Sequence, residues 1–136
     1  MNHEEQIQAY GKDVIENLSS MVKWTYDDFH KAMLAEFSVD KQNQVLFTLQ
    51  QFFPMCWDVK TIKKAPHETK HYAGAFSKLV KKQKLFSINI EHNPKIMAVW
   101  WPWGHGATVS VRLFLTNTSP YVAKTGLFRK LTRIFA

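Results

Sequence analysis

Residues 1–40 combine apolar and polar positions at helical spacing. Residues 4–22 carry one apolar stripe with mostly acids and amides between its members, and residues 25–37 carry a second. The first stripe consists of Ile7, Tyr10, Val14, Leu18 and Met21. The second consists of Phe29, Ala32, Met33 and Phe37, preceded by Thr25 and Asp28 as capping residues. This spacing predicts two amphipathic helices.

Residues 41–54 fit a third helix. Asp40 stands at its start, and Pro54 ends it because proline has no amide hydrogen to donate. Its apolar face consists of Val45, Leu46, Leu49, Phe52 and Phe53. An alternating strand through Val45, Phe47 and Leu49 is a second interpretation. Residues 55–65 fit either a short strand or a short helix, and the helix is slightly favoured.

Residues 66–83 predict a further helix, because Pro66 suits the first helical position. Its apolar stripe consists of Tyr72, Ala75, Phe76, Leu79 and Val80. Three segments with alternating apolar residues follow and predict strands, namely 85–91, 96–103 and 107–115. Turn sequences at 93–94 and 104–106 connect them as an antiparallel meander. From Val122 onward, apolar residues among lysines and arginines predict a final basic amphipathic helix.

These patterns predict a single α+β domain over residues 1–136, with helices first, a three-stranded antiparallel meander next and a terminal helix. The chain has 46% hydrophobic residues and only five glycines and five prolines, which is typical of a packed globular protein. Its acidic, polar start does not resemble a secretory signal, and its longest apolar run, 96–103, is too short to span a bilayer. A single cysteine, Cys56, fits a reducing compartment. We therefore expect a cytoplasmic protein without integral membrane association.

Charge divides the chain into two parts. Residues 1–40 hold eight acids and three lysines, a net charge of −5, whereas residues 41–136 hold three acids and fifteen lysines and arginines, a net charge of +12. The total is +7. A positive field of this size favours a polyanionic partner such as nucleic acid or an acidic membrane surface.

Within the basic part, the lysines of the predicted helix 66–83 share one direction. Lys70, Lys78, Lys81 and Lys82 fall within about 60° of one common direction at ~100° per residue, and the apolar stripe points away from them. A solvated helix face usually mixes acids with bases, but here Glu68 is the only acid. The pattern favours an anion-binding face, with ordinary solvation as the alternative.

The order of these elements resembles a winged helix-turn-helix domain over about residues 41–103. The segment from Ala75 to Phe86 (AFSKLVKKQKLF) is similar to the end of a recognition helix and the first wing strand of that family. The resemblance implies that Thr69, Lys70 and Lys78 lie nearest the bases in the major groove of duplex DNA. It implies backbone contacts for Lys81, Lys82, Lys84 and Lys95. The acidic helices at 4–37 would then be left for homodimerisation or shielding.

Two other groups of residues could carry a function. His67-Glu68-Thr69-Lys70-His71 matches the H-E-x-x-H pattern of zinc hydrolases, but His67 and His71 share their helix face with lysines and have no third ligand at a recognisable spacing. The aromatic cluster of residues 100–105 suggests a stacking or ligand site. Its candidate residues are Trp100, His105 and Arg112.

The sequence thus predicts non-catalytic binding of nucleic acid, with duplex DNA as the expected ligand, and no cofactor. A protein-binding or ligand-binding module that uses an aromatic-rich sheet is the alternative, and a zinc-dependent hydrolase is the third hypothesis.

Overall fold

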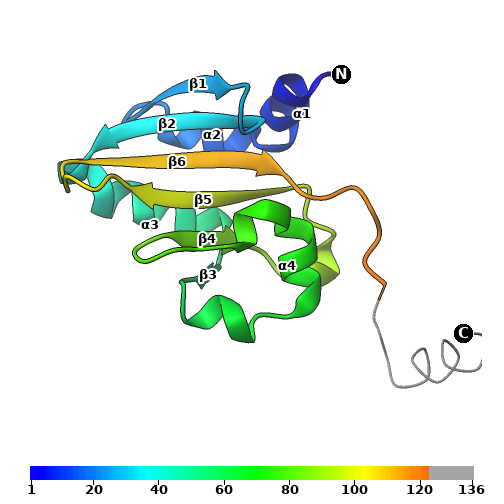
Figure 1. The fold of residues 1–136 in the computed structure, drawn as a ribbon. Coiled ribbons are helices and arrows are strands. Elements are labelled where there is room, and N and C mark those ends of the chain that lie inside the picture. Colours follow the sequence, from blue (N-terminus) through cyan, green and yellow to red (C-terminus); the bar gives the residue numbers. More distant parts are fainter. Residues whose placement is uncertain (123–136) are drawn as a thin grey trace, which may run out of the picture.

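The computed structural model describes residues 1–122, which form an α+β fold (Figure 1). Six strands make one antiparallel sheet in the order β1-β2-β6-β5-β4-β3. The strands are β1 (Lys23–Asp27), β2 (Ala32–Ser38), β3 (Met55–Trp57), β4 (Lys84–Ser87), β5 (Ile96–Pro102) and β6 (Thr108–Leu115). The expected arrangement, a meander of three strands, is therefore wrong, because β4, β5 and β6 continue into β3 on one side and into β2 and β1 on the other.

One face of the sheet is covered by three helices. These are α1 (His3–Tyr10), α2 (Lys12–Leu18) and α3 (Gln42–Phe52). Figure 1 shows two of them, α2 and α3, behind the strands, and α1 at the upper right, near the N-terminus. The buried side chains of the three helices include Ile7, Val14, Leu18, Val45 and Leu49. They pack on alternate residues of the strands, such as Met33, Ala35 and Phe37 of β2. Most of the apolar stripes of the first and third predicted helices thus lie in the core, as their periodicity indicated, but Tyr10 of the first stripe is 53% exposed.

The opposite face is covered by the connection between β3 and β4, which lies in front of the sheet in Figure 1. This connection contains a 3₁₀ turn (Thr61–Lys64), α4 (His67–Ala73) and a second 3₁₀ turn (Gly74–Ser77). Ile62, Ala65, Ala73 and Leu79 are its buried anchors, and they meet Leu85, Met97, Val99 and Phe114 of the strands. The sheet is therefore the middle layer between two small cores.

Residues 23–38, which the sequence predicted to be largely helical, form the β1–β2 hairpin. The helical interpretation relied on Phe29, but Phe29 lies in the turn with 88% of its surface exposed. Met33, Ala35 and Phe37 instead alternate toward the core, and β2 pairs with β6, whose partner residues are far away in the sequence. The acidic part of the chain is therefore not a helical unit.

The other predicted helices are shorter than expected. The first is divided at Gly11 into α1 and α2. The one predicted over 66–83 ends at Ala73, because Gly74 adopts φ 59° and ψ −133°, a conformation that does not continue a helix. Residues 55–65 contain both a strand and a 3₁₀ turn, not one helix. The expected terminal helix lies in residues 123–136, outside the described part of the chain.

The predicted strands 96–103 and 107–115 correspond to β5 and β6 with small differences at their ends. The strand predicted over 85–91 is wrong in its second half, because β4 ends at Ser87 and a 3₁₀ turn (Ile90–His92) follows. Within residues 1–122, no helix combines the length and the apolar character needed to cross a membrane.

Candidate nucleic-acid interface

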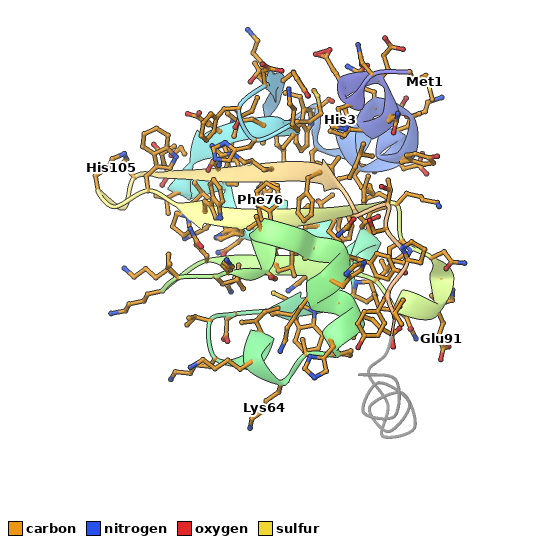
Figure 2. The ribbon with its side chains drawn as sticks, turned by 45° about the vertical axis from the view of Figure 1, so that its right-hand side comes forward. Met1, His3, Lys64, Phe76, Glu91 and His105 are labelled. Atoms are coloured by element: carbon orange, nitrogen blue, oxygen red, sulfur yellow. The ribbon has the colours of Figure 1, made fainter. Side chains whose placement is uncertain are left out.

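The largest group of positive charges lies on the connection between β3 and β4. We call residues 58–84 the basic connection, which contains eight lysines and two acids, Asp58 and Glu68. Its lysines are Lys60, Lys63, Lys64, Lys70, Lys78, Lys81, Lys82 and Lys84. All are exposed except Lys70 and Lys84, which are partly buried. Figure 2 shows Lys64 at the outer side of this segment, away from the sheet.

The outward direction of these lysines follows from the anchors that alternate with them. Ile62, Ala65, Thr69 and Ala73 are 6%, 5%, 1% and 3% exposed and face the sheet. Lysines between these anchors face solvent. The start of the connection is fixed by Asp58, whose carboxylate accepts hydrogen bonds from the amides of Lys60 (2.9 Å) and Thr61 (2.8 Å). These bonds, chiefly that from Thr61, lower the pKa of Asp58.

The connection ends in a tight turn that presents two lysines. The amide of Gln83 donates to the carbonyl of Val80 (3.0 Å), and the amide of Val80 donates to the side-chain oxygen of Gln83 (2.9 Å). Lys81 and Lys82 occupy the two central positions of this turn, and Lys82 has φ 72°. Positive φ is uncommon outside glycine, so both hydrogen bonds help to hold an unfavourable conformation.

The lysines of the basic connection form no ion pair with a carboxylate of residues 1–122. The ion pairs within residues 1–122 are Asp27–His30, Asp27–Arg112 and Asp28–Lys31, and none includes the basic connection. Lys70 donates instead to the carbonyl of Lys63 at 3.1 Å. The charge of this segment is therefore not neutralised by ion pairing inside the described part of the protein.

The predicted DNA-contacting residues do not lie on one helix face as expected. Thr69 is 1% exposed and faces the sheet, so it is not available to read a base. Lys78, Lys81, Lys82 and Lys84 follow α4 in the chain and do not share a helix face with Lys70. With seven residues, α4 is also too short to present the expected long basic face. The physical reason is the break at Gly74.

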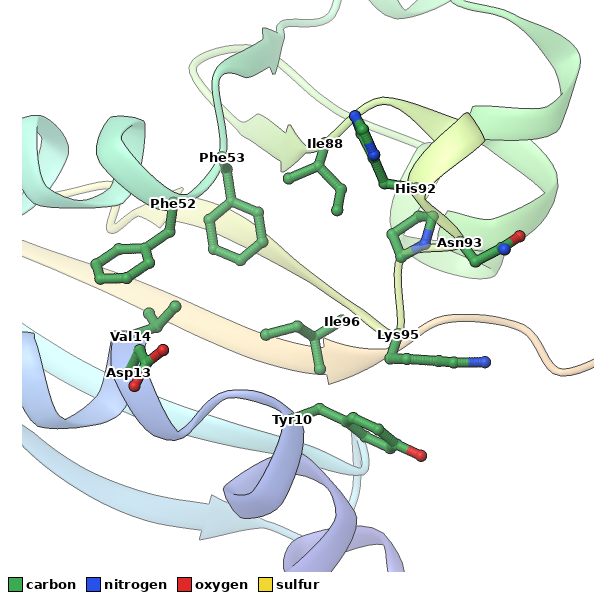
Figure 3. Close-up of a pocket in the computed structure, with 11 residues that line it drawn as sticks. Tyr10, Asp13, Val14, Phe52, Phe53, Ile88, His92, Asn93, Lys95 and Ile96 are labelled. Carbon is green, nitrogen blue, oxygen red and sulfur yellow. The ribbon is translucent and has the colours of Figure 1, made fainter.

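Lys95 lies apart from the other predicted contacts. It precedes β5, whereas Lys84 pairs with Trp100 near the other end of that strand. At about 3.3 Å per residue, the two positions are separated by roughly 17 Å. Lys95 instead lies beside the pocket of Figure 3.

The predicted aromatic site is also arranged differently. Trp100 is 4% exposed and packs edge to face against Phe37, with ring centroids 5.6 Å apart, so it belongs to the core. Arg112 lies over the neighbouring Trp101, its guanidinium carbon 4.0 Å from the ring centroid. His105 lies in the β5–β6 turn with its ring centroid 5.8 Å from that of Trp103. The three proposed residues therefore do not form one site.

Arg112 belongs to a polar cluster that the sequence analysis missed. Its Nε donates to Asp27 Oδ2 at 3.0 Å, and Nδ1 of His30 lies 2.7 Å from the same oxygen. Burial of the Asp27 carboxyl opposes ionisation, but the hydrogen bonds from Arg112 and His30 outweigh it and lower the pKa of Asp27 to about 2. His30 also packs edge to face against Trp101 at 5.3 Å. The cluster lies on the sheet beside Phe76, whose ring packs against Trp101. In the sequence, only the polar residues at 27–31 indicated it.

The histidines of the H-E-x-x-H motif do not gather metal ligands. His67 is exposed, and Nε2 of His71 lies 2.6 Å from the carbonyl oxygen of Ser119. Among residues 1–122, no group of three or more histidines, cysteines and acids is placed to hold a metal ion. The third ligand that a zinc hydrolase needs is therefore missing from the described residues.

A small pocket of about 310 Å³ opens on the helical side of the sheet (Figure 3). Tyr10, Phe52 and Phe53 contribute rings to it, and Asp13, His92 and Lys95 contribute polar groups. It lies outside the aromatic sheet surface that the sequence suggested as a ligand site.

Comparisons of the chain with protein-family models, with curated proteins and with solved structures each gave no match. The geometry of the site is therefore the basis for assigning a function.

Proposed function

We propose that this protein binds nucleic acid without catalysis, through phosphate contacts made by the basic connection. The observation that carries the proposal is the set of eight lysines on residues 58–84, which has no ion-pair partner within residues 1–122. Lysines without an ion-pair partner attract phosphates, and their binding is favoured by the release of counterions from the nucleic acid. Such contacts position a protein on the backbone and do not read sequence.

This mode replaces insertion of a long recognition helix into the major groove. The buried face of α4 lies against the sheet, and the side chain of Lys70, the lysine of this helix, donates to the backbone carbonyl of Lys63. The exposed lysines before and after α4 are the groups available to a phosphate backbone. A cytoplasmic location belongs to the same proposal, and so does the absence of a cofactor.

The test is fluorescence anisotropy with labelled DNA across a salt series. Wild-type protein is expected to bind at micromolar concentration or tighter in about 50 mM salt, with affinity falling steeply as salt rises. Lys81→Glu with Lys82→Glu is expected to weaken binding at least tenfold and to reduce the slope of log affinity against log salt by about 2. No binding by wild-type protein at low salt contradicts the proposal.

A matched control removes the same charge elsewhere. Lys12→Glu with Lys23→Glu changes the net charge equally. Both lysines are exposed, Lys12 in α2 on the opposite face of the sheet and Lys23 in β1 at the edge farthest from β3. This variant is expected to keep most of the wild-type affinity. Equal loss in both variants would mean that net charge alone, and not the basic connection, determines binding.

The pocket of Figure 3 favours a second candidate function, binding of a small apolar molecule. Its volume of about 310 Å³ and its aromatic lining suit such a ligand. An apolar fluorescent probe such as anilinonaphthalene sulfonate would bind wild-type protein and be excluded by Ile88→Trp, which fills the pocket from its wall. Equal fluorescence with both proteins contradicts this candidate.

A further inference from the structure

Trp103 is a large aromatic side chain on a turn, and 46% of its surface is exposed. It belongs to neither of the two core clusters of the described residues. The exposed half of the indole adds nothing to the stability of the fold, since a tryptophan stabilises a protein through its buried area. The position of Trp103 therefore suggests a contact with a partner.

The backbone around Trp103 is held by hydrogen bonds. Its amide donates to the carbonyl of Thr108 (2.9 Å), and its carbonyl accepts from the amide of Gly106 (3.0 Å). The amide of Ala107 donates to Nδ1 of His105 at 3.0 Å. Gly106 has φ 81°, which glycine adopts without strain. The indole is thus presented by an ordered turn, so that a partner stacking on it loses little additional freedom.

This aromatic turn lies beside the lysine turn of the basic connection. Lys84 pairs with Trp100, so that the start of β4 lies beside the end of β5, at the usual separation of about 4.8 Å. The turn holding Lys81 and Lys82 immediately precedes β4, and Trp103 immediately follows β5. Figures 1 and 2 place both turns at the same end of the sheet, which His105 marks in Figure 2.

We infer that Trp103 stacks on an unpaired base of single-stranded nucleic acid whose phosphates contact Lys81, Lys82 and Lys84. This inference rests on the proposed function and adds the class of ligand to it. An indole face is attractive to any base, whereas the bases of a duplex stack on each other and do not offer their faces. Adjacent aromatic and cationic groups are the combination that single-stranded binding uses.

Three ligands of equal length separate the contributions of base and phosphate. They are a labelled oligothymidine, an abasic strand with the same number of phosphates, and a mixed-sequence duplex. We expect wild-type protein to bind the oligothymidine roughly 5- to 150-fold tighter than the abasic strand, which is the usual range for one stacked base. Binding of the duplex is expected to be weaker than binding of the oligothymidine.

Variants then assign the difference to Trp103. Trp103→Ala should bind oligothymidine only as tightly as the abasic strand and should leave abasic binding unchanged. Trp103→Phe keeps an aromatic face and should restore part of the preference. Lys81→Glu with Lys82→Glu should weaken both single strands. Because the indole is outside both core clusters, the circular dichroism spectrum of Trp103→Ala should match that of wild-type protein, and the melting temperature should fall by no more than a few degrees for the loss of the half-buried ring.

The outcomes distinguish the two proposals. Equal binding of oligothymidine and abasic strand by wild-type protein, or unchanged oligothymidine binding by Trp103→Ala, overturns the stacking site and leaves phosphate binding in place. Duplex binding as tight as oligothymidine binding overturns the preference for single strands. Failure of wild-type protein to bind any of the three ligands overturns the proposed function itself.

Discussion

At the residue scale, Asp27 joins groups that lie far apart in the sequence. Its carboxylate accepts from Arg112 of β6 and faces His30 in the β1–β2 turn, and only 13% of its side chain is exposed. Arg112 in turn lies over Trp101. A charged acceptor with two donors near a protein surface contributes more than an exposed pair does. We therefore expect Asp27 to stabilise the fold.

Replacement of this carboxylate should have an effect that depends on pH. Asp27→Asn is expected to lower the free energy of unfolding by about 1–2 kcal/mol at pH 7, after allowance for partial solvent screening. The folded-state pKa of about 2 lies below the ordinary aspartate pKa of 3.8, so the contribution of the charge is complete above about pH 5. It is lost as the pH falls from about 4 to 2, because the carboxyl is then protonated in both states.

Urea unfolding of wild-type protein and Asp27→Asn at pH 7, 4 and 2.5 measures this difference. The difference between the two proteins should be largest at pH 7, slightly smaller at pH 4 and reduced to roughly a third at pH 2.5. Asp28→Asn is the matched control, since Asp28 is 83% exposed and pairs only with Lys31 at the surface. It should change stability by less than about 0.5 kcal/mol. A difference for Asp27→Asn that stays constant down to pH 2.5 would contradict the role of its charge.

At the element scale, the junction of α1 and α2 depends on the absence of a side chain at Gly11. An added Cβ would lie 2.6 Å from Leu113 Cδ2 and 2.8 Å from the carbonyl oxygen of Ile7. Leu113 is fully buried, and the Ile7 carbonyl is part of the backbone, so neither can move away freely. Gly11 therefore allows the two helices to lie close against β6.

Gly11→Ala should lower the free energy of unfolding by roughly 1–3 kcal/mol, the usual effect of overpacking, as measured by urea or thermal unfolding. Gly104→Ala is the control, because a Cβ there meets no atom within 4 Å and its φ is not positive. It should change stability by less than about 0.5 kcal/mol. Equal stability of both variants would show that the α1–α2 junction adjusts without loss.

The same elements show what the sequence could predict. Some segments, such as α3, β5 and β6, have a clear spacing of apolar residues within their own sequence. These elements lie close to where that spacing predicted them. In residues 25–37 the helical and the alternating periods are both present, and pairing with β6 selects the strand. Pairing between residues that are far apart in the sequence is not visible in a local pattern. The helix predicted over 66–83 was too long for a different reason. It ends because of the backbone conformation of Gly74, which the spacing of apolar residues does not indicate.

The sequence indicated which residues make up most of the candidate site, but not how they are arranged in space. The excess of lysines is evident in the sequence, and the basic connection contains six of the seven predicted nucleic-acid contacts, Lys95 excepted. Thr69 was misassigned because an isolated threonine on a helix gives no signal of which face is buried. Trp103 could have been favoured over Trp100, because Pro102 and Gly104 beside it indicate a turn.

At the scale of the whole molecule, the division of charge along the chain becomes a division in space. The acidic segments at 4–5, 13–16 and 27–36 belong to α1, α2 and the hairpin at the β1–β2 edge, whereas the basic connection covers the β4–β3 side. The ion pairs within residues 1–122 all lie near the β1–β2 turn and Arg112. Repulsion among the lysines of the basic connection is therefore a destabilising contribution that salt can screen.

Sodium chloride is accordingly expected to stabilise the protein. Between 20 and 300 mM the melting temperature should rise by about 3 °C, which corresponds to roughly 1 kcal/mol for a chain of this size. Lys81→Glu with Lys82→Glu should show a smaller rise, because it removes part of the repulsion. A melting temperature that falls with salt would mean that attraction between the acidic and basic sides outweighs repulsion. The same lysines thus predict opposite effects of salt, a more stable fold and weaker binding to nucleic acid, and thermal unfolding and anisotropy on one sample can measure both.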